Sequence, residues 1–284
     1  MLGLDPDPAA LWPAAVAGVE PGGDRATATA SAVVRHCRAA IEAAGAACVA
    51  VKLQLACFER LGAAGWTALV ASAAAAREAG LLVIADGKRG DVPITARAYA
   101  QALVGSTPGP FGAIAGLGAD AFTVNPLLGR DSLEPLVAAA VEAGAGCFCL
   151  VRTSNPGAAE VQDADTSGRP LHELLAIIVD ELGSAHVARS ELSAVGAVCG
   201  ATRPEHLGRL RQLMPRAIFL LPGVGAQGGG VEALAPAFAP HPAAGLVTAS
   251  RSIVDAHRSR SGDPAAAARA AAEELRAAAW ALAG

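Results

Sequence analysis

Carboxylate and ammonium side chains alternate in the segment Asp86–Asp91, which reads Asp-Gly-Lys-Arg-Gly-Asp. Five apolar residues, 81–85, precede it without a polar break, which is typical of a strand buried on both faces of a parallel sheet. On an extended chain Asp86 and Lys88 project to the same side, and Gly90 permits a turn before the second carboxylate. An ammonium between two carboxylates at a strand end predicts a site that stabilises charge or moves a proton.

Lysine is rare in this chain. Of 22 Lys and Arg residues only two are lysines, Lys52 and Lys88, and both lie at the ends of apolar runs. Lysine differs from arginine in carrying a compact charge on a group that can shift its pKa and transfer a proton. The usage indicates that lysine is present where arginine would fail, and the alternative is that both are surface residues.

Composition excludes several classes of protein. The net charge of -4, with no basic tract, argues against nucleic acid as a partner. No apolar run reaches the roughly 20 residues of a membrane span, and the N-terminus does not resemble a signal peptide. The six cysteines include no C-x-x-C pair, so we expect reduced thiols and a cytoplasmic protein. The six histidines are scattered and do not predict a metal site.

Apolar runs and helical segments alternate eight times along the chain. Because alternating βα units imply a parallel sheet, we expect a single-domain (β/α)8 TIM barrel over residues 1–284, with an open doubly wound sheet as the alternative. A Gly/Pro-rich connector (105–118) and a polar loop (152–169) interrupt the pattern. The expected strands are 2–4, 47–53, 81–85, 121–124, 146–151, 194–199, 217–221 and 245–249. The expected helices include 29–44, 63–79, 93–104, 132–143, 171–182, 203–213, 231–238 and a C-terminal helix at 264–282.

Polar side chains follow the C-terminal ends of these strands. In a barrel such residues gather at one mouth, where catalytic groups lie, whereas in an open sheet they would be spread along an edge. This placement favours the barrel. The residues concerned are Asp5, Lys52, Asp86, Lys88, Asn125, Ser154, Gln227 and Arg251.

A glycine-rich loop at 223–228 matches G-x-G-x-x-G, the pattern of dinucleotide-binding folds. It lies late in the chain, and the next strand ends in Ser250 and Arg251 instead of the acid that binds ribose in those folds. In a barrel, the loops after strands seven and eight form a frequent phosphate site. We therefore expect the loop and Arg251 to hold a phosphate, with Gln227 reaching toward the substrate.

The segment 86–95, Asp-Gly-Lys-Arg-Gly-Asp-Val-Pro-Ile-Thr, resembles the D-x-K-x-x-D-I-x-x-T signature of the orotidine 5'-phosphate decarboxylases. The variant is similar to the type 2, mycobacterial-type subfamily. Further matches follow in the family's order and cover residues 3 to about 255. They are Gly3-Leu4-Asp5-Pro6, Val51-Lys52, Thr123-Val124-Asn125-Pro126, Thr153-Ser154-Asn155-Pro156-Gly157, Pro222–Gly228 and Ser250-Arg251-Ser252-Ile253.

The resemblance implies conversion of orotidine 5'-phosphate to UMP and CO2 in pyrimidine biosynthesis, without cofactor or metal. Lys88 would protonate C6 of the pyrimidine as the carboxylate leaves, within a charged array that also contains Lys52, Asp86 and Asp91. The resemblance further implies a homodimer whose partner supplies Asp91 and Thr95 to a shared active site.

Substrate-binding roles also come from the resemblance. Asp5 and Lys52 would hold ribose hydroxyls, Ser154 the pyrimidine, and Arg251 the phosphate, with Gln227 contacting both ends. The full implied set of binding residues is Asp5, Thr95, Asn125, Ser154, Pro222, Gln227, Gly228, Ser250 and Arg251.

The chemistry fits these residue types. Loss of CO2 from an sp2 carbon leaves a localised carbanion, which needs a fixed cation beside it. An ammonium can then donate its proton, which a guanidinium does poorly. A carboxylate at Asp91 would repel the substrate carboxylate and then hold Lys88 in place. Arg89 should point the other way, to a surface or interface.

Three alternatives remain at this point. The first is a Mg2+-dependent sugar-phosphate lyase or decarboxylase of the same superfamily, which usually carries an acid at the position of Lys52. The second is a Schiff-base aldolase using Lys52 or Lys88, and the third is a catalytically inactive barrel that serves as a binding scaffold. One departure from the family is that Met1 stands two residues before Gly3, so the first strand is expected to be short.

Overall fold

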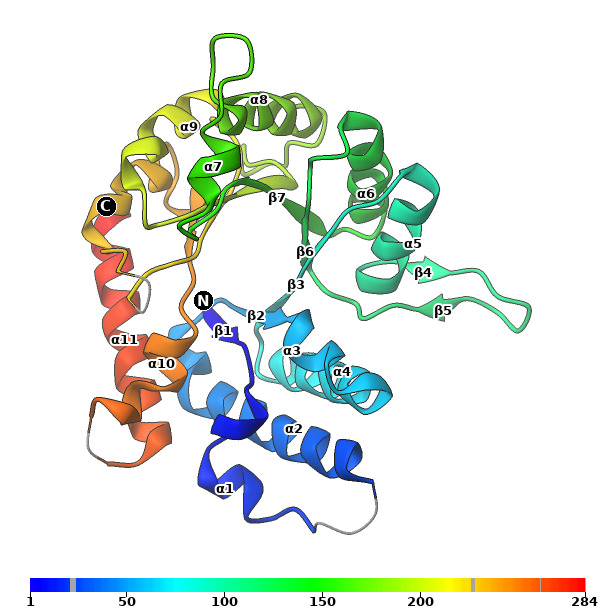
Figure 1. The fold of residues 1–284 in the computed structure, drawn as a ribbon, viewed down its shortest axis with the longest axis vertical. Coiled ribbons are helices and arrows are strands. Elements are labelled where there is room, and N and C mark those ends of the chain that lie inside the picture. Colours follow the sequence, from blue (N-terminus) through cyan, green and yellow to red (C-terminus); the bar gives the residue numbers. More distant parts are fainter. Residues whose placement is uncertain (21–23, 226–227, 261, 284) are drawn as a thin grey trace. The chain divides into compact units, whose positions relative to one another are not determined.

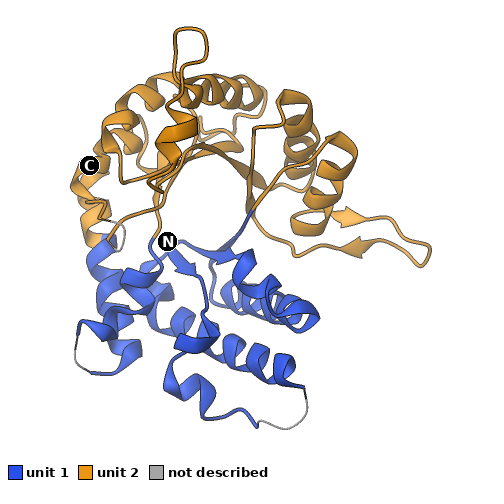
Figure 2. Cartoon of the chain, viewed as in Figure 1, with its two compact units in different colours: residues 1–87, 249–276 blue, residues 88–248, 277–284 orange. Residues whose placement is uncertain are grey.

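The computed structural model of the protein describes residues 1–20, 24–225, 228–260 and 262–283. The chain forms two compact units, residues 1–87 with 249–276 and residues 88–248 with 277–284 (Figure 2). Each unit contains parallel strands that alternate with helices, as the ribbon in Figure 1 shows. The α/β class expected from the sequence is therefore confirmed, and each unit is described in turn.

The first unit contains a parallel sheet in the order β1-β2-β3, and β3 ends in the second unit. Gly3 pairs with Lys52, and Gln54 pairs with Asp86, so the register places the polar ends of these strands together. Its strands are β1 (Leu2–Leu4), β2 (Ala50–Gln54) and β3 (Leu82–Arg89). Its helices are α1 (Pro13–Val16), α2 (Arg25–Ala44), α3 (Leu55–Glu59), α4 (Gly62–Glu78), α10 (Arg251–Val254) and most of α11 (Pro264–Leu282).

The first strand is as short as the sequence predicts. All three of its residues are buried, and Leu2 forms a parallel bridge with Ala249. The amide of Gly3 donates to the Ala249 carbonyl at 2.8 Å. Ala249 comes two residues after the last strand of the chain and lies beside β1 on the side opposite β2.

The second unit contains five parallel strands in the order β6-β7-β8-β9-β10. The strands β6, β8 and β9 are buried at every residue, as expected for strands covered on both faces. The five are β6 (Ala121–Val124), β7 (Gly146–Arg152), β8 (Val195–Cys199), β9 (Phe219–Leu221) and β10 (Gly245–Val247). The helices are α5 (Pro93–Leu103), α6 (Arg130–Glu142), α7 (Ala158–Gln162), α8 (Leu171–Gly183) and α9 (Leu207–Leu213).

Two helices end by the same local device before the strand that follows them. Gly80, after α4, has φ +75°, and the amides of Gly80 and Leu81 donate to the carbonyls of Arg77 and Ala76. Gly144, after α6, has φ +70° with the equivalent pair of bonds. This is the Schellman motif, which requires a residue in the left-handed region and therefore favours glycine.

Some segments differ from the sequence-based expectation. The connector 105–118 carries an antiparallel hairpin of β4 (Ser106–Thr107) and β5 (Ile114–Ala115). The loop 152–169 contains α7, whose five residues are too few to show a helical period. The helix expected at 231–238 is a 3-10 helix, Glu232–Phe238, with a proline inside it.

Candidate functional site

Three charged residues expected at the site meet in the first unit. The Lys52 ammonium lies 2.7 Å from Asp86 Oδ2 and 3.6 Å from Asp5 Oδ1. Lys52 and Asp86 are buried, with 6% and 5% of their surface exposed, whereas Asp5 is exposed. Asp5 comes directly after β1, Lys52 lies in β2 and Asp86 lies in β3. The parallel register of these strands brings their C-terminal ends to one edge of the sheet.

The two carboxylates keep the Lys52 ammonium charged. Burial acts to lower the pKa of Lys52, but the charges of Asp86 and then Asp5, with their hydrogen bonds, outweigh it and raise the pKa above its ordinary value. Gln54 Nε2 also donates to Asp86 Oδ2, at 3.3 Å. A charged lysine held this rigidly can donate hydrogen bonds and stabilise nearby negative charge.

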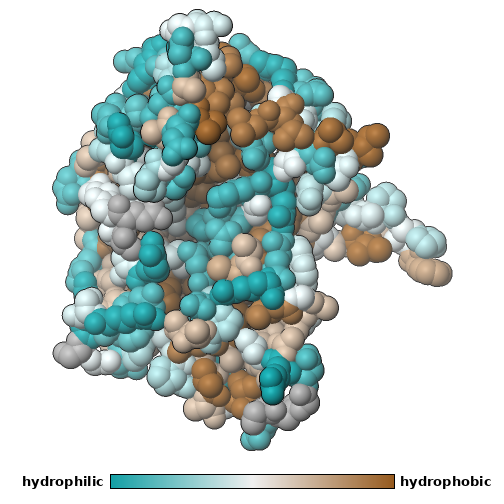
Figure 3. All heavy atoms as spheres, in the orientation of Figure 1, coloured by the Kyte–Doolittle hydropathy of each residue, from teal (hydrophilic) through white to brown (hydrophobic). Residues whose placement is uncertain are grey.

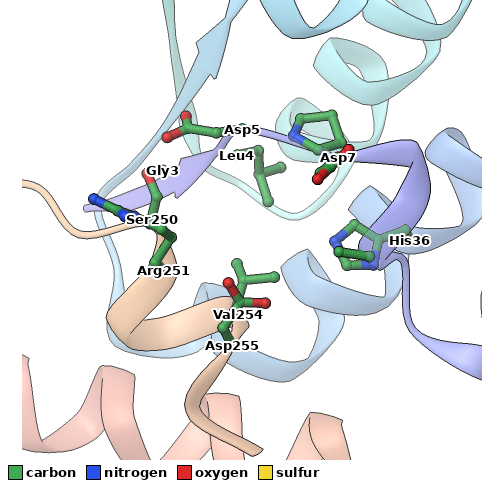
Figure 4. Close-up of a pocket in the computed structure, with 11 residues that line it drawn as sticks. Gly3, Leu4, Asp5, Asp7, His36, Ser250, Arg251, Val254 and Asp255 are labelled. Atoms are coloured by element: carbon green, nitrogen blue, oxygen red, sulfur yellow. The ribbon is translucent and has the colours of Figure 1, made fainter. Parts of the chain in front are cut away.

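Ser250 and Arg251 lie beside Asp5. They begin α10, and with Asp5 they line a pocket of about 50 Å³ in the first unit (Figure 4). The pocket is large enough for water and too small for a nucleotide. Its other walls come from Gly3, Leu4, Pro6, Asp7, Ala10, His36, Val254 and Asp255.

Steric contacts explain why the Gly-Leu-Asp-Pro motif begins with glycine, Gly3. A Cβ on Gly3 would stand 1.9 Å from Ser250 Oγ and 3.3 Å from the Ala249 carbonyl oxygen. Only glycine permits the start of α10 to approach β1 this closely. Gly3 thus helps to set Ser250 and Arg251 next to Asp5.

Lys88 has an unusual backbone conformation for a lysine. Its φ of 48° lies in the left-handed region, its side chain is exposed, and its amide donates to Thr123 Oγ1 at 2.8 Å. The alternation rule that predicts Asp86 and Lys88 on one side therefore does not apply at Lys88. A non-glycine residue held in this region is a strained position of the kind that gathers at functional sites.

Gly90 leaves room for the backbone of Asn125, which a larger residue would meet. The φ of Gly90 is not in the left-handed region, so its backbone conformation does not itself demand glycine. A Cβ on Gly90 would stand 2.8 Å from the Asn125 carbonyl oxygen and 3.2 Å from Asn125 Cβ. The Asn125 amide donates to the Arg89 carbonyl at 2.8 Å. The end of β3 therefore lies directly against the residue after β6.

Asp91 and Thr95 flank the start of α5 in the second unit. Asp91 is half-buried and its Oδ1 accepts from the Val92 amide at 2.8 Å. Thr95 is exposed in the first turn of the helix. Arg89 stacks its guanidinium over the Tyr99 ring of α5, 5.5 Å from the centroid.

Ser154 follows β7 and lines the wider pocket of the second unit. The pocket has a volume of about 440 Å³, within the range of ligand sites. Thr202, after β8, donates its hydroxyl to the Ser154 carbonyl at 3.0 Å. The remaining lining residues are Arg152, Asn155, Pro156 and Arg203.

The glycine-rich loop after β9 folds back on itself. The Gly225 amide donates to Gly229 O at 3.0 Å, and the amides of Gly228 and Gly229 donate to Gly225 O and Gly223 O. The Pro222 carbonyl accepts from Ala201 at 2.8 Å. Gln227 lies outside the described residues. Two amides of the expected phosphate loop, those of Gly225 and Gly228, and the amide of Gly229 directly after it are thus engaged in local hydrogen bonds.

Several contributing residues were not selected from the sequence. Gln54 stands two positions after Lys52 on β2, and strand alternation was a usable signal for it. Thr123 was part of a quoted motif, but its bond to the Lys88 amide connects positions 35 residues apart. The contact of Thr202 with Ser154 spans 48 residues and had no local signal.

The described part of the chain shows neither a membrane-spanning helix nor a metal-binding cluster. Every helix there is too short or too polar to cross a bilayer. Over the same residues, no three His, Cys, Asp or Glu side chains are grouped so that they could hold a metal ion.

The chain is similar to known decarboxylases over most of its length. The model of the orotidine 5'-phosphate decarboxylase / HUMPS family matches residues 2–271. The orotidine 5'-phosphate decarboxylase of Rhodopirellula baltica is 43% identical over 237 residues, which cover 82% of this chain and 76% of the relative. The enzyme of that name from Roseiflexus castenholzii is 38% identical over 284 residues, covering 97% and 89%. The structure of Leishmania donovani OMP decarboxylase has a TM-score of 0.73 at 31% identity, covering 99% and 92%.

A chain of parallel strands and helices with charged groups at its strand ends is thus matched over almost its whole length by one enzyme family. The chain belongs to the orotidine 5'-phosphate decarboxylase / HUMPS family.

Proposed function

We propose that the protein decarboxylates orotidine 5'-phosphate to UMP and CO2 in pyrimidine biosynthesis, as a cytoplasmic enzyme of the type 2 subfamily. The observation that carries the proposal is the buried Lys52–Asp86 pair with Asp5 beside it, in a chain of this family. A family match alone would also fit an inactive scaffold. A lysine buried at such a strand end, held charged by two acids, has little structural purpose.

Lys88 carries the proton in this proposal. The C6–carboxylate bond breaks, CO2 leaves, and the electron pair stays on C6 of the pyrimidine. The Lys88 ammonium stabilises the developing carbanion and gives C6 a proton, and water then reprotonates the amine. The bond from the Lys88 amide to Thr123 and the strained backbone support this role, because they fix the lysine before the substrate arrives.

Lys52, Asp86 and Asp91 complete the charged array. Asp86 orients Lys52, and Lys52 with Asp5 holds the ribose hydroxyls. Asp91 stands beside the substrate carboxylate and then holds Lys88 in place. No metal and no organic cofactor enters the proposed reaction, because the lysines supply both the positive charge and the proton.

The remaining residues bind the two ends of the substrate. Ser154, in its 440 Å³ pocket, contacts the pyrimidine, and Arg251 clamps the phosphate. The loop amides exchange their internal bonds for bonds to the phosphate as it binds, which is a conformational step. The other proposed contacts are Thr95, Asn125, Pro222, Gln227, Gly228 and Ser250.

We also propose a closed (β/α)8 barrel as a single domain over residues 1–284. The pairing of Leu2 with Ala249 supports closure, since it joins the first strand to a residue two positions after the last strand. The cytoplasmic location is supported by six free cysteines, among which burial raises the pKa of Cys37 to about 12.

The proposed assembly is a homodimer in which the partner supplies Asp91 and Thr95. Exposed apolar side chains at the start of α5 and on the hairpin that follows α5 support it, since a solvent-facing apolar patch commonly marks an interface. Ile94 is 89% exposed in the first turn of α5, and Phe111 is fully exposed on the β4–β5 hairpin. Figure 3 shows apolar groups on this hairpin, which projects from the second unit.

The test follows the ultraviolet absorbance of orotidine 5'-phosphate in the presence of EDTA. We expect conversion to UMP by the wild type and a loss on the order of 10²–10³-fold or more in Lys88→Ala, because the cation beside C6 is removed. Lys88→Arg separates the two roles: charge is kept but proton donation is poor, so it should remain well below wild type.

Each other outcome has a definite meaning. A folded wild type without activity would refute the decarboxylase proposal. Activity that disappears with EDTA would indicate the metal-dependent sugar-phosphate reaction. Trapping of the chain by borohydride in the presence of substrate would indicate a Schiff base.

A further inference from the structure

The segment that carries Ser154 is held by side chains outside the expected site. Thr153, directly before Ser154, donates its amide to Gln162 Oε1 at 2.8 Å. Gln162 Nε2 in turn donates to Thr153 Oγ1 at 2.9 Å. Gln162 is the last residue of α7. This short helix therefore holds the backbone next to Ser154, the residue proposed to bind the pyrimidine.

The chemistry of this contact requires a carboxamide. One end of the side chain accepts from a backbone N–H while the other donates to a hydroxyl, and a carboxamide offers an acceptor and donors together. The Thr153 hydroxyl is thereby free to donate to Asn155 Oδ1, at 2.7 Å. Gln162 thus holds the backbone directly before Ser154, and the Thr153–Asn155 bond joins the side chains of the two residues that flank the serine.

An ion pair between the buried Arg152 and the partly exposed Asp163 sets the position of Gln162. Arg152 donates to Asp163 Oδ1 and Oδ2 at 2.8 and 3.0 Å, and to the Thr153 carbonyl at 2.9 Å. His172 Nδ1 lies 2.9 Å from the Gln162 carbonyl and 3.1 Å from Asp163 Oδ1. Arg152 is 3% exposed and its partner Asp163 is partly exposed, and their paired hydrogen bonds anchor the end of α7 to the end of β7.

The other side of Ser154 is equally close-packed. A Cβ on Gly200 would stand 2.8 Å from both the Cα and the amide nitrogen of Ser154. Thr202 holds the Ser154 carbonyl. The serine backbone therefore has little freedom, and its direction depends on the contacts around it.

We infer that Gln162 is a positioning residue for Ser154: by clamping Thr153 it presents the serine to the pyrimidine, while touching no substrate atom itself. The inference rests on the proposed function of Ser154. It distinguishes Gln162 from a helix residue that contributes only stability. If Gln162 acts only by orienting Ser154, the effect of replacing Gln162 should depend on whether Ser154 is present.

The first experiment needs no substrate. Amide hydrogen exchange of the peptide that contains residues 152–156 should be at least several-fold faster in Gln162→Ala than in wild type, because the Thr153 amide loses its acceptor. Glu160→Ala, an exposed position in the same helix, is the matched control and should leave exchange unchanged. Unchanged exchange in Gln162→Ala would overturn the inference even if the wild type proved inactive.

The second experiment measures kcat and KM for orotidine 5'-phosphate. Gln162→Ala should lower kcat/KM about three- to ten-fold, the effect of one or two hydrogen bonds, whereas Glu160→Ala should not. Gln162→Glu keeps the acceptor for the Thr153 amide and should restore part of the loss. Combined with Ser154→Ala, Gln162→Ala should add no further loss. Losses that multiply would show that Gln162 acts independently of Ser154 and would refute the inference.

Discussion

Lys52 is a cation that two carboxylates hold in a buried position. Taking a charge out of water is costly, so a pair such as Lys52–Asp86 adds little net stability, although removing one partner leaves an unpaired buried charge. Its value lies in geometry. A lysine that is charged and immobile before the substrate binds needs no reorganisation as negative charge develops.

His36 is a buried base that the proposed chemistry does not use. Its Nδ1 accepts from the Trp12 amide at 3.2 Å, and its ring meets the Trp12 ring edge-on, 5.3 Å between centroids. Burial lowers the pKa of His36 to about 4; Asp255 acts in the opposite direction, and His257 adds to the lowering. The neutral ring is therefore the form that packs against Trp12.

This predicts an acid-sensitive stability. Between pH 6.5 and 4 the unfolded chain binds a proton that folded His36 excludes, so stability falls as the pH is lowered through this range. From pH 7 to 4, His36 alone should remove about 3 kcal/mol from the free energy of unfolding. Urea unfolding of wild type and His36→Gln at pH 7, 5 and 4 measures the difference. Equal losses in both proteins would contradict this account.

At the scale of elements, contacts at glycines decide how strand ends approach one another. Gly3 allows α10 to reach β1, and Gly90 allows the end of β3 to lie against Asn125. In both cases a methyl group would meet atoms that cannot move without shifting a site residue. Gly3 and Gly90 are thus part of the architecture that positions the site residues.

Gly90→Ala tests this point. Because the new Cβ would meet the Asn125 backbone, we expect about 1–3 kcal/mol of destabilisation. Activity should fall roughly ten- to hundred-fold, since Lys88 and Asp91 lie on either side of the shifted residue. Urea unfolding and the decarboxylation assay measure the two effects.

Gly208→Ala is the control for Gly90→Ala. Gly208 lies in α9 with no atom within 4 Å of an added Cβ, and alanine is favoured in a helix by about 0.5–1 kcal/mol. This variant should be as active as wild type and at least as stable. A wild-type result for Gly90→Ala as well would mean that Asn125 yields easily and that the contact is unimportant.

At the scale of the whole molecule, a shared active site in a dimer predicts that two inactive variants regain activity when mixed. If each active site takes Lys88 from one subunit and Asp91 from the other, Lys88→Ala and Asp91→Ala are both inactive alone. Refolded together in equal amounts, half of the dimers are mixed, and each mixed dimer regains one intact site. We expect about a quarter of wild-type activity.

The control mixes Lys88→Ala with Lys52→Ala. Because the proposal takes both lysines from the same subunit, no mixed dimer contains an intact site, and activity should stay absent. Recovery in this control, or none in the first mixture, would refute the shared site. Sedimentation of each mixture would establish that dimers have formed.

The sequence was sufficient to predict many of the strands and most of the candidate site residues of this protein. Residues 81–85 predicted a buried strand, and the strand Leu82–Arg89 contains four of them. Residues 121–124 were predicted without error. These predictions succeed because a strand buried on both faces needs an unbroken apolar run, which is local information. The family resemblance then selected the candidate residues, including the Lys52, Asp86 and Asp5 that the structure brings together.

Tertiary structure decided what depends on residues far apart in the chain. The left-handed conformation of Lys88, the steric need for Gly90 and the clamp of Gln162 on Thr153 each arise from contacts that strand periodicity does not encode. The short helix α7 and the β4–β5 hairpin were missed because neither is long enough to show a period. The sequence by itself thus determined the strands and the chemical groups at their ends, because local pattern and residue type suffice for both. Only the folded chain decided how those groups are oriented, because orientation depends on packing between distant segments.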